Sequence, residues 1–250
     1  MEVVFIGTGV GLPSKKRGTP GLLVKIGDEH LLFDLGPGIV RKILEEGFDY
    51  NEIDYIFYTH LHVDHVNDLP ALLFAAKSPL ALRKKDLHLV GPKGLKDFYT
   101  KLLHLYGEQL ISSAYNVFLR EMEDDVIEKG DWKITTRSAL HTEHSIGYRI
   151  EDKEGKVVVY SGDTDYTVDI VKLAKNAHLL ILECSFPNDI KVEGHLTPNL
   201  AGQIAKESKC ERLILTHLYP VCDQHNILED VRKVFRGQIT VAYDGLRITI

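Results

Sequence analysis

Between Tyr58 and Val66 the chain reads YTHLHVDHV, which places three histidines and one aspartate within six consecutive positions. If protonated together, the histidines would repel one another as cations. If buried neutral without partners, they would leave donors and acceptors unsatisfied. A divalent metal ion removes both problems, because neutral imidazole nitrogen and carboxylate oxygen are ligands of first-row metals. The segment therefore predicts a metal site.

The H-x-H-x-D-H spacing divides this segment into two groups of candidate ligands. Where the chain leaves a strand, His60 and His62 are two residues apart and can point to the same side. Asp64 and His65 are adjacent and cannot easily join them, but they can serve a second ion. Two ions roughly 3.5–4 Å apart, bridged by a carboxylate and a water, are the usual arrangement for hydrolysing phosphodiesters and some acyl bonds.

Such a two-metal site needs more ligands than one segment holds, and further candidates follow downstream. His141 and His144 occur in SALHTEHSIGYRI, Asp163 occurs in VVVYSGDTD, and His217 occurs in LILTHLYP. These residues can complete the site only if the fold brings their loops together.

Short apolar or β-branched runs alternate with segments of helical period along the whole chain. They predict strands at residues 3–6, 22–26, 31–34, 53–58, 87–90, 132–138, 148–150, 157–161, 179–183, 212–216, 239–242 and 246–250. They predict helices at residues 39–46, 69–76, 95–106, 168–175, 199–208 and 227–235, with Pro198 placed to open the fifth. This interleaving favours an α/β layered sandwich over a helical bundle or an all-β barrel.

The candidate ligands fall where predicted strands end. Residues 60–65, Asp163 and His217 each follow a strand, and Glu183 ends another. In layered α/β folds the loops that leave these strand ends assemble sites, because a rigid sheet points several side chains at one place. We therefore expect these residues to converge.

The composition sets limits on the kind of protein. A chain of 250 residues with 44% hydrophobic and 26% charged residues predicts one globular domain, residues 1–250. The net charge of −6 argues against an overall basic surface for nucleic acid or anionic lipid, although a local cationic groove stays open.

No apolar run approaches the roughly 20 residues of a membrane helix. No signal peptide is expected at MEVVFIGTG, and Cys184, Cys210 and Cys222 read as free thiols, so we expect a cytoplasmic protein without a membrane partner.

Taken in order from Gly7 to His217, H-x-H-x-D-H, a lone downstream histidine, SGDT and THLYP resemble the metallo-β-lactamase superfamily. Within it, GTGVGLPSKKRG, the HTEHSIGYRI spacing and GHLTPNLAGQIA most resemble ribonuclease Z and its phosphodiesterase relatives. The resemblance implies a four-layer αβ/βα sandwich with two divalent metal ions at one edge, zinc ahead of manganese. It also implies a homodimer.

The resemblance assigns ligands position by position. It implies one ion held by His60, His62 and His141, a second held by Asp64, His65 and His217, and Asp163 as the bridge between them. His141 is preferred over His144 because it precedes GYR at the interval of the family.

The implied chemistry uses the bridging water as nucleophile, with Asp64 orienting it or accepting its proton. His195 in EGHLT matches the histidine that serves as general acid in the ribonuclease Z group, and Glu183 in LECSF matches the glutamate that orients it. Asp34 in FDLGPG matches an aspartate that fixes a ligand histidine, although a plain turn aspartate is an equal alternative.

Departures from ribonuclease Z bear on the substrate. That family carries a long arm that grips transfer RNA, between the lone histidine and the bridging aspartate. Only residues 142–162 lie there in this chain, enough for a hairpin. The HEAT motif is LECS here, and Gly18 stands where an asparagine is expected. We therefore expect a smaller substrate, either a small or cyclic phosphodiester or the end of a single-stranded RNA.

Two basic segments have an open role. Lys15, Lys16 and Arg17 lie where relatives place groups that meet a phosphate or an RNA backbone, and a solvated basic loop is an equally good account. Residues 82–86, LRKKD, are expected to be a solvated basic loop.

Other functions remain as alternatives. The same ligands serve thioester, lactone and β-lactam hydrolysis, but a thiolate leaves without help, so a dedicated acid such as His195 would be idle in a thioesterase. A non-catalytic protein that binds metal or nucleic acid is a third class, and the seven filled ligand positions argue against it. FIGTGVG is similar to a dinucleotide-binding loop, but Leu12 replaces its third glycine, so no nicotinamide cofactor is expected.

Overall fold

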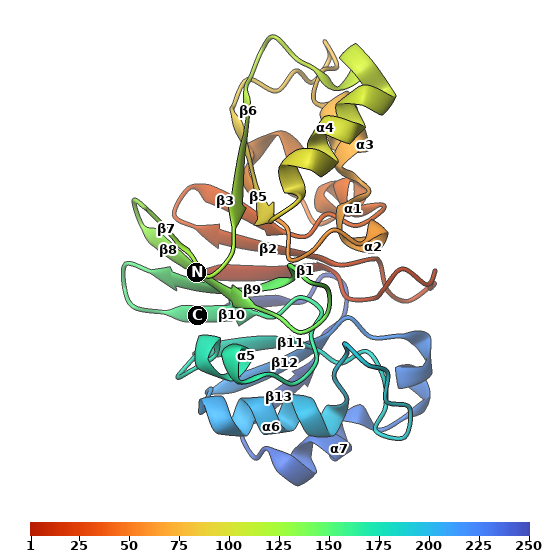
Figure 1. The fold of residues 1–250 in the computed structure, drawn as a ribbon, viewed down its shortest axis with the longest axis vertical. Coiled ribbons are helices and arrows are strands. Elements are labelled where there is room, and N and C mark those ends of the chain that lie inside the picture. Colours follow the sequence, from red (N-terminus) through yellow and green to blue (C-terminus); the bar gives the residue numbers. More distant parts are fainter.

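Two seven-stranded sheets lie face to face in the computed structural model, which describes residues 1–250 (Figure 1). The first sheet has the order β14 (Arg247–Thr249), β1 (Glu2–Gly7), β2 (Gly21–Ile26), β3 (Glu29–Phe33), β4 (Ile53–Phe57), β5 (Leu87–Pro92), β6 (Val117–Met122). The second has the order β13 (Gln238–Val241), β12 (Arg212–Thr216), β11 (Leu179–Glu183), β10 (Val157–Tyr160), β9 (Ile146–Asp152), β8 (Trp132–Ser138), β7 (Val126–Lys129).

Helices cover the outer face of each sheet (Figure 1). The first sheet carries α1 (Ile39–Glu45), α2 (Val63–Val66), α3 (Leu69–Ala75) and α4 (Leu95–Tyr106). The second carries α5 (Val168–Leu173), α6 (Pro198–Ser208) and α7 (Ile227–Val234). Short 3-10 turns are η1 (Tyr50–Glu52), η2 (Gly107–Leu110) and η3 (Pro220–Gln224). None of these helices combines the length and the apolar character needed to cross a bilayer.

Three apolar layers hold the sandwich together. One lies between the two sheets, and the other two lie between each sheet and its helices. The strands are buried on both faces, so alternate side chains enter different layers. In β1, Val3 and Phe5 face the layer between the sheets, whereas Val4 and Ile6 face the helices. The expected four-layer αβ/βα sandwich is confirmed.

All twelve predicted strands and six predicted helices are present, with boundaries shifted by a few residues. Pro198 occupies the first position of α6, as expected. The sequence did not predict β6, β7 and the single turn of α2. β6 and β7 are the edge strands of their sheets, and most of their side chains are at least partly exposed, so they lack the apolar run that marks a buried strand.

The prediction of a solvated basic loop at residues 82–86 holds for the exposed Lys84 and is wrong for Arg83. Arg83 is 2% exposed, and its guanidinium donates to five backbone carbonyls, at distances of 2.6 to 3.4 Å. An arginine offers five donors in a fixed fork, so it can saturate carbonyls that converge from two segments. Burial lowers the pKa of Arg83. The side chain ties the entry to β4 to the entry to β5, which sequence pattern alone does not reveal.

Candidate metal centre

Strand direction brings the candidate ligands to one edge of the sandwich. β3 to β6 pair in parallel in the first sheet, and β10 to β13 pair in parallel in the second. Residues 60–65 follow β4, His141 follows β8, Asp163 follows β10, and His217 follows β12. The backbone N–H of Ile146 donates to the carbonyl of Thr59 at 2.9 Å, which joins the two sheets at this edge. The cluster therefore draws side chains from both sheets.

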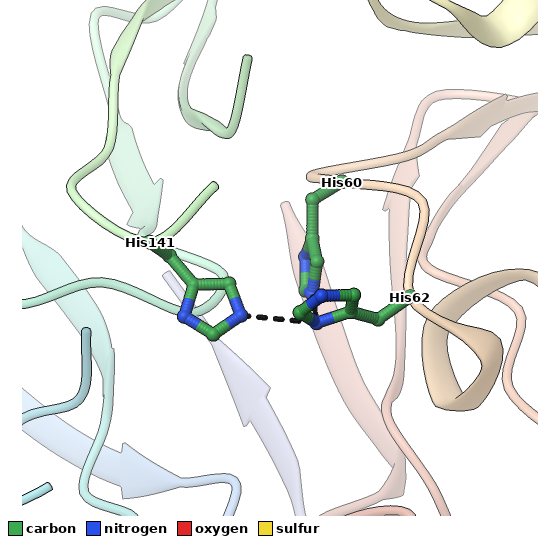
Figure 2. A group of neighbouring side chains, drawn as sticks. All are labelled: His60, His62 and His141. Carbon is green, nitrogen blue, oxygen red and sulfur yellow. Dashed lines mark hydrogen bonds between the residues drawn. The ribbon is translucent and has the colours of Figure 1, made fainter. Parts of the chain in front are cut away.

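Three histidines form the first group of facing nitrogens. Nδ1 of His62 lies 3.0 Å from Nε2 of His60 and 3.0 Å from Nε2 of His141, and Figure 2 shows the rings converging from two separate segments. A single proton on His62 cannot serve both contacts well. Nitrogens that share a tetrahedral zinc ion lie about 3.3 Å apart, given Zn–N bonds of about 2.0–2.1 Å. The spacing suits a common cation.

The second group consists of Asp64, His65 and His217. Nε2 of His65 lies 3.3 Å from Nε2 of His217. Oδ2 of Asp64 lies 3.8 Å from the first nitrogen and 3.7 Å from the second. Two nitrogens and one carboxylate oxygen again face a common point.

Asp163 lies between the two groups and offers one oxygen to each. Oδ2 lies 3.8 Å from Nε2 of His60 and 3.7 Å from Nε2 of His141, whereas Oδ1 lies 3.5 Å from His65 and 3.3 Å from His217. The side chain is almost fully buried, and its Oδ1 has no hydrogen-bond partner. A buried carboxylate oxygen without a partner is costly unless a cation meets it. The donor set therefore fits two ions, with four candidate ligand atoms around each.

Hydrogen bonds on the outer side of two rings fix where their protons sit. Nδ1 of His65 lies 2.9 Å from Oδ2 of Asp34, and Nδ1 of His141 lies 2.9 Å from the carbonyl oxygen of Gly194. The carbonyl oxygen of Gly194 and the carboxylate of Asp34 accept these hydrogen bonds, so in both rings Nδ1 carries the hydrogen and Nε2 presents its lone pair inward. The contact expected between Asp34 and a ligand histidine is present.

Two hydroxyl groups fix the position of the proton in the rings of His60 and His217. The Thr59 hydroxyl lies 3.0 Å from Oδ2 of Asp34 and donates to that carboxylate, so it accepts from Nδ1 of His60 at 3.0 Å. The Ser185 hydroxyl donates to Oε2 of Glu183 at 2.6 Å and accepts from Nδ1 of His217 at 3.0 Å. All four Nε2 atoms are thus prepared as acceptors, as metal ligation requires.

The pKa shifts of four residues in the cluster favour neutral imidazoles and ionised carboxylates. Burial lowers the pKa of His60 and of His141, which keeps both rings neutral. Burial alone would raise the pKa of Asp163, but His217 and His65 lower it by more, so the carboxyl is ionised. Burial also opposes ionisation of Asp64, but the neighbouring rings of His217 and His65 together lower its pKa by more. These are the protonation states of bound ligands.

His65 differs from the other ring ligands. Burial lowers its pKa, but the charges of Asp163 and Asp34 raise it well above its ordinary value. A proton therefore competes with a cation for Nε2 of this ring, and metal affinity should fall as the pH falls.

His195 and Glu183 form a pair beside the ligands. Nδ1 of His195 donates to Oε1 of Glu183 at 2.8 Å, and the His195 ring lies 4.7 Å from the His141 ring. Glu183 is 1% exposed and also accepts the backbone N–H groups of Thr164 and Ser185. Burial lowers the pKa of His195, and Glu183 raises it by more, so the net pKa is raised. A proton can thus rest on Nε2 of His195, next to the ligands.

His144 lies outside the cluster. Its Nε2 lies 3.9 Å from Oε1 of the exposed Glu143, and the ring shares no group of candidate ligands with the others. The preference for His141 agrees with this geometry.

Sequence reasoning missed the support for Asp64. The backbone N–H of Gly11 donates to Oδ2 of Asp64 at 2.9 Å, so residues 8–18 rest against the second group. A Cβ atom at Gly36 would lie 2.0 Å from the carbonyl oxygen of Asp64, so only glycine fits there. Neither contact leaves a signal in the local pattern.

Asp244 holds both ends of the segment 8–18. Its Oδ1 accepts from the backbone and hydroxyl of Thr8 at 3.0 and 2.8 Å, and its Oδ2 accepts from the backbone of Gly18 at 2.7 Å and from Lys42 at 2.8 Å. In the sequence, AYDGL reads as an ordinary Asp-Gly turn, which hides this role.

The three basic residues of this segment, residues 15–17, differ in their contacts. Arg17 donates to the Thr8 hydroxyl at 2.9 Å and to the carbonyl of Ala242 at 2.6 Å, so it is a structural tie. Lys16 is 73% exposed and pairs with Asp223 at 3.3 Å. Lys15 is exposed and has neither an ion pair nor a side-chain hydrogen bond.

A family model and several known proteins are similar to this chain. A model described as a β-lactamase superfamily domain matches residues 30–218. Ribonuclease Z of Lactococcus lactis subsp. lactis (strain IL1403) is 30% identical over 275 positions, which cover 87% of this chain and 89% of that protein. Ribonuclease Z of Bacillus velezensis (strain DSM 23117 / BGSC 10A6 / LMG 26770 / FZB42) is 27% identical over 311 positions, which cover 100% and 99%.

Two solved structures share the fold over nearly their full length. The metallo-β-lactamase fold protein YhfI from Bacillus subtilis is 28% identical, with a TM-score of 0.85 and coverage of 99% of both chains. The short form of human tRNase Z is 26% identical, with a TM-score of 0.84 and coverage of 100% of this chain and 99% of that one.

Proposed function

The chain belongs to the β-lactamase superfamily and to its ribonuclease Z-like branch, and from this premise we propose that it hydrolyses small or cyclic phosphodiesters, or the ends of single-stranded RNA, with two divalent ions. Its relatives make it a metal-dependent hydrolase of the nuclease and phosphodiesterase kind. The two-ion centre depends on one observation above all. The carboxylate of Asp163 faces a separate group of donors with each oxygen, and Oδ1 has no partner within the protein.

The donor set favours zinc over manganese. Five of the seven candidate ligands are imidazoles, which suit zinc, whereas manganese prefers carboxylate, carbonyl and water oxygens. When bound, the two ions would supply a water that is nucleophilic at neutral pH and would neutralise charge on the phosphate. The histidines, Asp64 and Asp163 would hold the ions, and Asp64 would also orient the attacking water or accept its proton.

His195 would act as the general acid. Glu183 fixes the ring through Nδ1, so Nε2 is the atom that can give a proton to a leaving alkoxide. The raised pKa of His195 keeps that proton available near neutral pH. A thiolate would not need it, so the pair favours phosphodiesters over thioesters.

The size of the substrate follows from the segment between His141 and Asp163. Residues 142–162 form only the β9–β10 hairpin. The alignment with the Bacillus velezensis ribonuclease Z needs 311 positions for a chain of 250 residues, so that relative carries stretches with no counterpart here. Without a gripping arm, a compact phosphodiester is the better fit.

Two further proposals concern the cellular compartment and the oligomeric state. The three cysteines are buried and unpaired, which suits a reducing compartment, so we place the protein in the cytoplasm. We also keep the homodimer that the resemblance implies, for which light scattering coupled to gel filtration is the direct measurement.

A panel of substrates tests the function. Metal-loaded protein should hydrolyse bis(p-nitrophenyl) phosphate and a cyclic nucleotide, and should act far more slowly on a thioester and an acyl lactone. Protein stripped by a chelator should be inactive and should recover with zinc or manganese. Equal rates for loaded and stripped protein would overturn the proposal, and so would a preference for the thioester.

A further inference from the structure

Two aromatic rings stack at the edge of the metal centre. Phe186 and Tyr219 have ring centroids 4.4 Å apart and an interplanar angle of 22°. Phe186 lies three residues beyond Glu183 and the end of β11, and Tyr219 lies two residues beyond His217, after β12. The parallel pairing of these strands carries both rings to the same place, and the backbone N–H of Tyr219 donates to the carbonyl of Ser185 at 3.3 Å.

The stacked pair lies beside the candidate acid, His195, and one candidate ligand, His217. The Phe186 ring lies 5.7 Å from the His195 ring, and the Tyr219 ring lies 6.5 Å from it. Tyr219 also lies 6.4 Å from the ring of His217. Both aromatic side chains are partly exposed, whereas His217 is buried.

Packing does not account for these two rings. Neither belongs to any of the three apolar layers of the fold. The hydroxyl of Tyr219 has no hydrogen-bond partner, although the hydroxyls of Tyr148 and Tyr160 donate to a carbonyl and a carboxylate. Aromatic side chains outside the core, next to a catalytic centre, are a common means of holding a planar ligand.

We propose that Phe186 and Tyr219 form a stacking surface for a nucleobase, so that the substrate is a nucleoside phosphodiester and not one with two aliphatic groups. The inference rests on the proposed function and names the substrate class of the same site. One sugar separates the base of a nucleotide from its phosphate, which matches a stacking surface directly beside His195 and the ligands. Stacking accepts every base, because each has a π face.

The test uses two substrates that share a leaving group and a phosphodiester. These are thymidine 5′-(p-nitrophenyl) phosphate and methyl p-nitrophenyl phosphate, assayed with the metal-loaded protein. Stacking of one base on aromatic rings gives about a fivefold to hundredfold advantage. The wild-type ratio of kcat/KM, nucleoside over methyl, should lie in that range, with most of the difference in KM.

Variants assign the preference to the pair. Phe186→Leu and Tyr219→Leu should each lower the ratio at least fivefold, whereas Tyr219→Phe should keep it, because it retains the ring. Tyr106→Leu is the matched control, since Tyr106 is 40% exposed at the end of α4, outside the apolar layers. A wild-type ratio near one would overturn the inference, as would an unchanged ratio in both leucine variants.

Failure of the proposed function gives a different result. If the loaded protein hydrolyses neither diester, that function falls, and calorimetric binding of thymidine 5′-monophosphate decides the stacking surface by itself. The stacking surface would be supported if thymidine 5′-monophosphate binds more tightly than methyl phosphate. Tyr219→Leu should weaken that binding, and Tyr106→Leu should not. Equal binding of the two phosphates would overturn it.

Discussion

At the residue scale, the rings of the candidate ligands are oriented by the groups behind them. Glu183 is the shared anchor, because it accepts from the Ser185 hydroxyl that holds His217 and from Nδ1 of His195. One buried carboxylate therefore orients both a candidate ligand and the candidate acid. Such outer partners normally change metal affinity or activity by roughly 10- to 100-fold when they are removed.

Removing His195 should affect substrates according to their leaving groups. His195→Ala should slow a dinucleotide, which releases an alkoxide, by about 100-fold to 10,000-fold, because general acid catalysis contributes that much. The same change should affect bis(p-nitrophenyl) phosphate far less, since nitrophenolate leaves without a proton. Steady-state rates of both substrates with one metal-loaded preparation make the comparison. Equal losses would remove the acid role from His195.

The convergence of the candidate residues of the centre could be expected from the sequence to a large extent. Histidines crowded into residues 60–65 left a signal, and Asp163 and His217 lay in recognisable motifs, so their convergence could be expected. Thr59 and Ser185 could not be identified, because a hydroxyl that orients an imidazole has no spacing rule of its own. The same holds for Tyr219, whose position became meaningful only beside Phe186.

At the element scale, the buried strands position the site and the segment 8–18 closes against it. Strands such as β11, buried at every residue, read clearly as apolar runs. The edge strands β6 and β7 did not, because exposed side chains interrupt their pattern. Asp244 joins the segment 8–18 from 226 residues further along the chain, a distance over which local pattern carries no information.

Removing this anchor should destabilise the protein. Asp244→Ala leaves four donors without their acceptor, and we expect a loss of about 2–4 kcal/mol in the free energy of unfolding. Denaturant unfolding of the wild type and the variant measures it. Asp189→Ala is the control, because that side chain is 71% exposed and lies 3.9 Å from its only ion-pair partner, so its effect should stay within about 0.5 kcal/mol. Equal losses in the two variants would contradict the anchoring role.

At the scale of the whole molecule, the candidate metal centre lies between the two halves of the sandwich. Residues 60–65 extend from the first sheet, whereas His141, Asp163 and His217 extend from the second. Ions bound here would join the sheets and should add their binding free energy to the stability of the fold. The family resemblance predicted this layout, because it relates loops that no local pattern connects.

Metal analysis of the purified protein tests the central claim most directly. Mass spectrometry of metals after desalting should find close to two ions per chain, and Asp163→Ala should lose both, because its oxygens face both groups. His62→Ala should lose only the ion of the first group, and thermal unfolding should shift downward as ions are lost. If fully folded wild-type protein, supplied with zinc or manganese, never holds more than one ion per chain, the two-metal centre is contradicted.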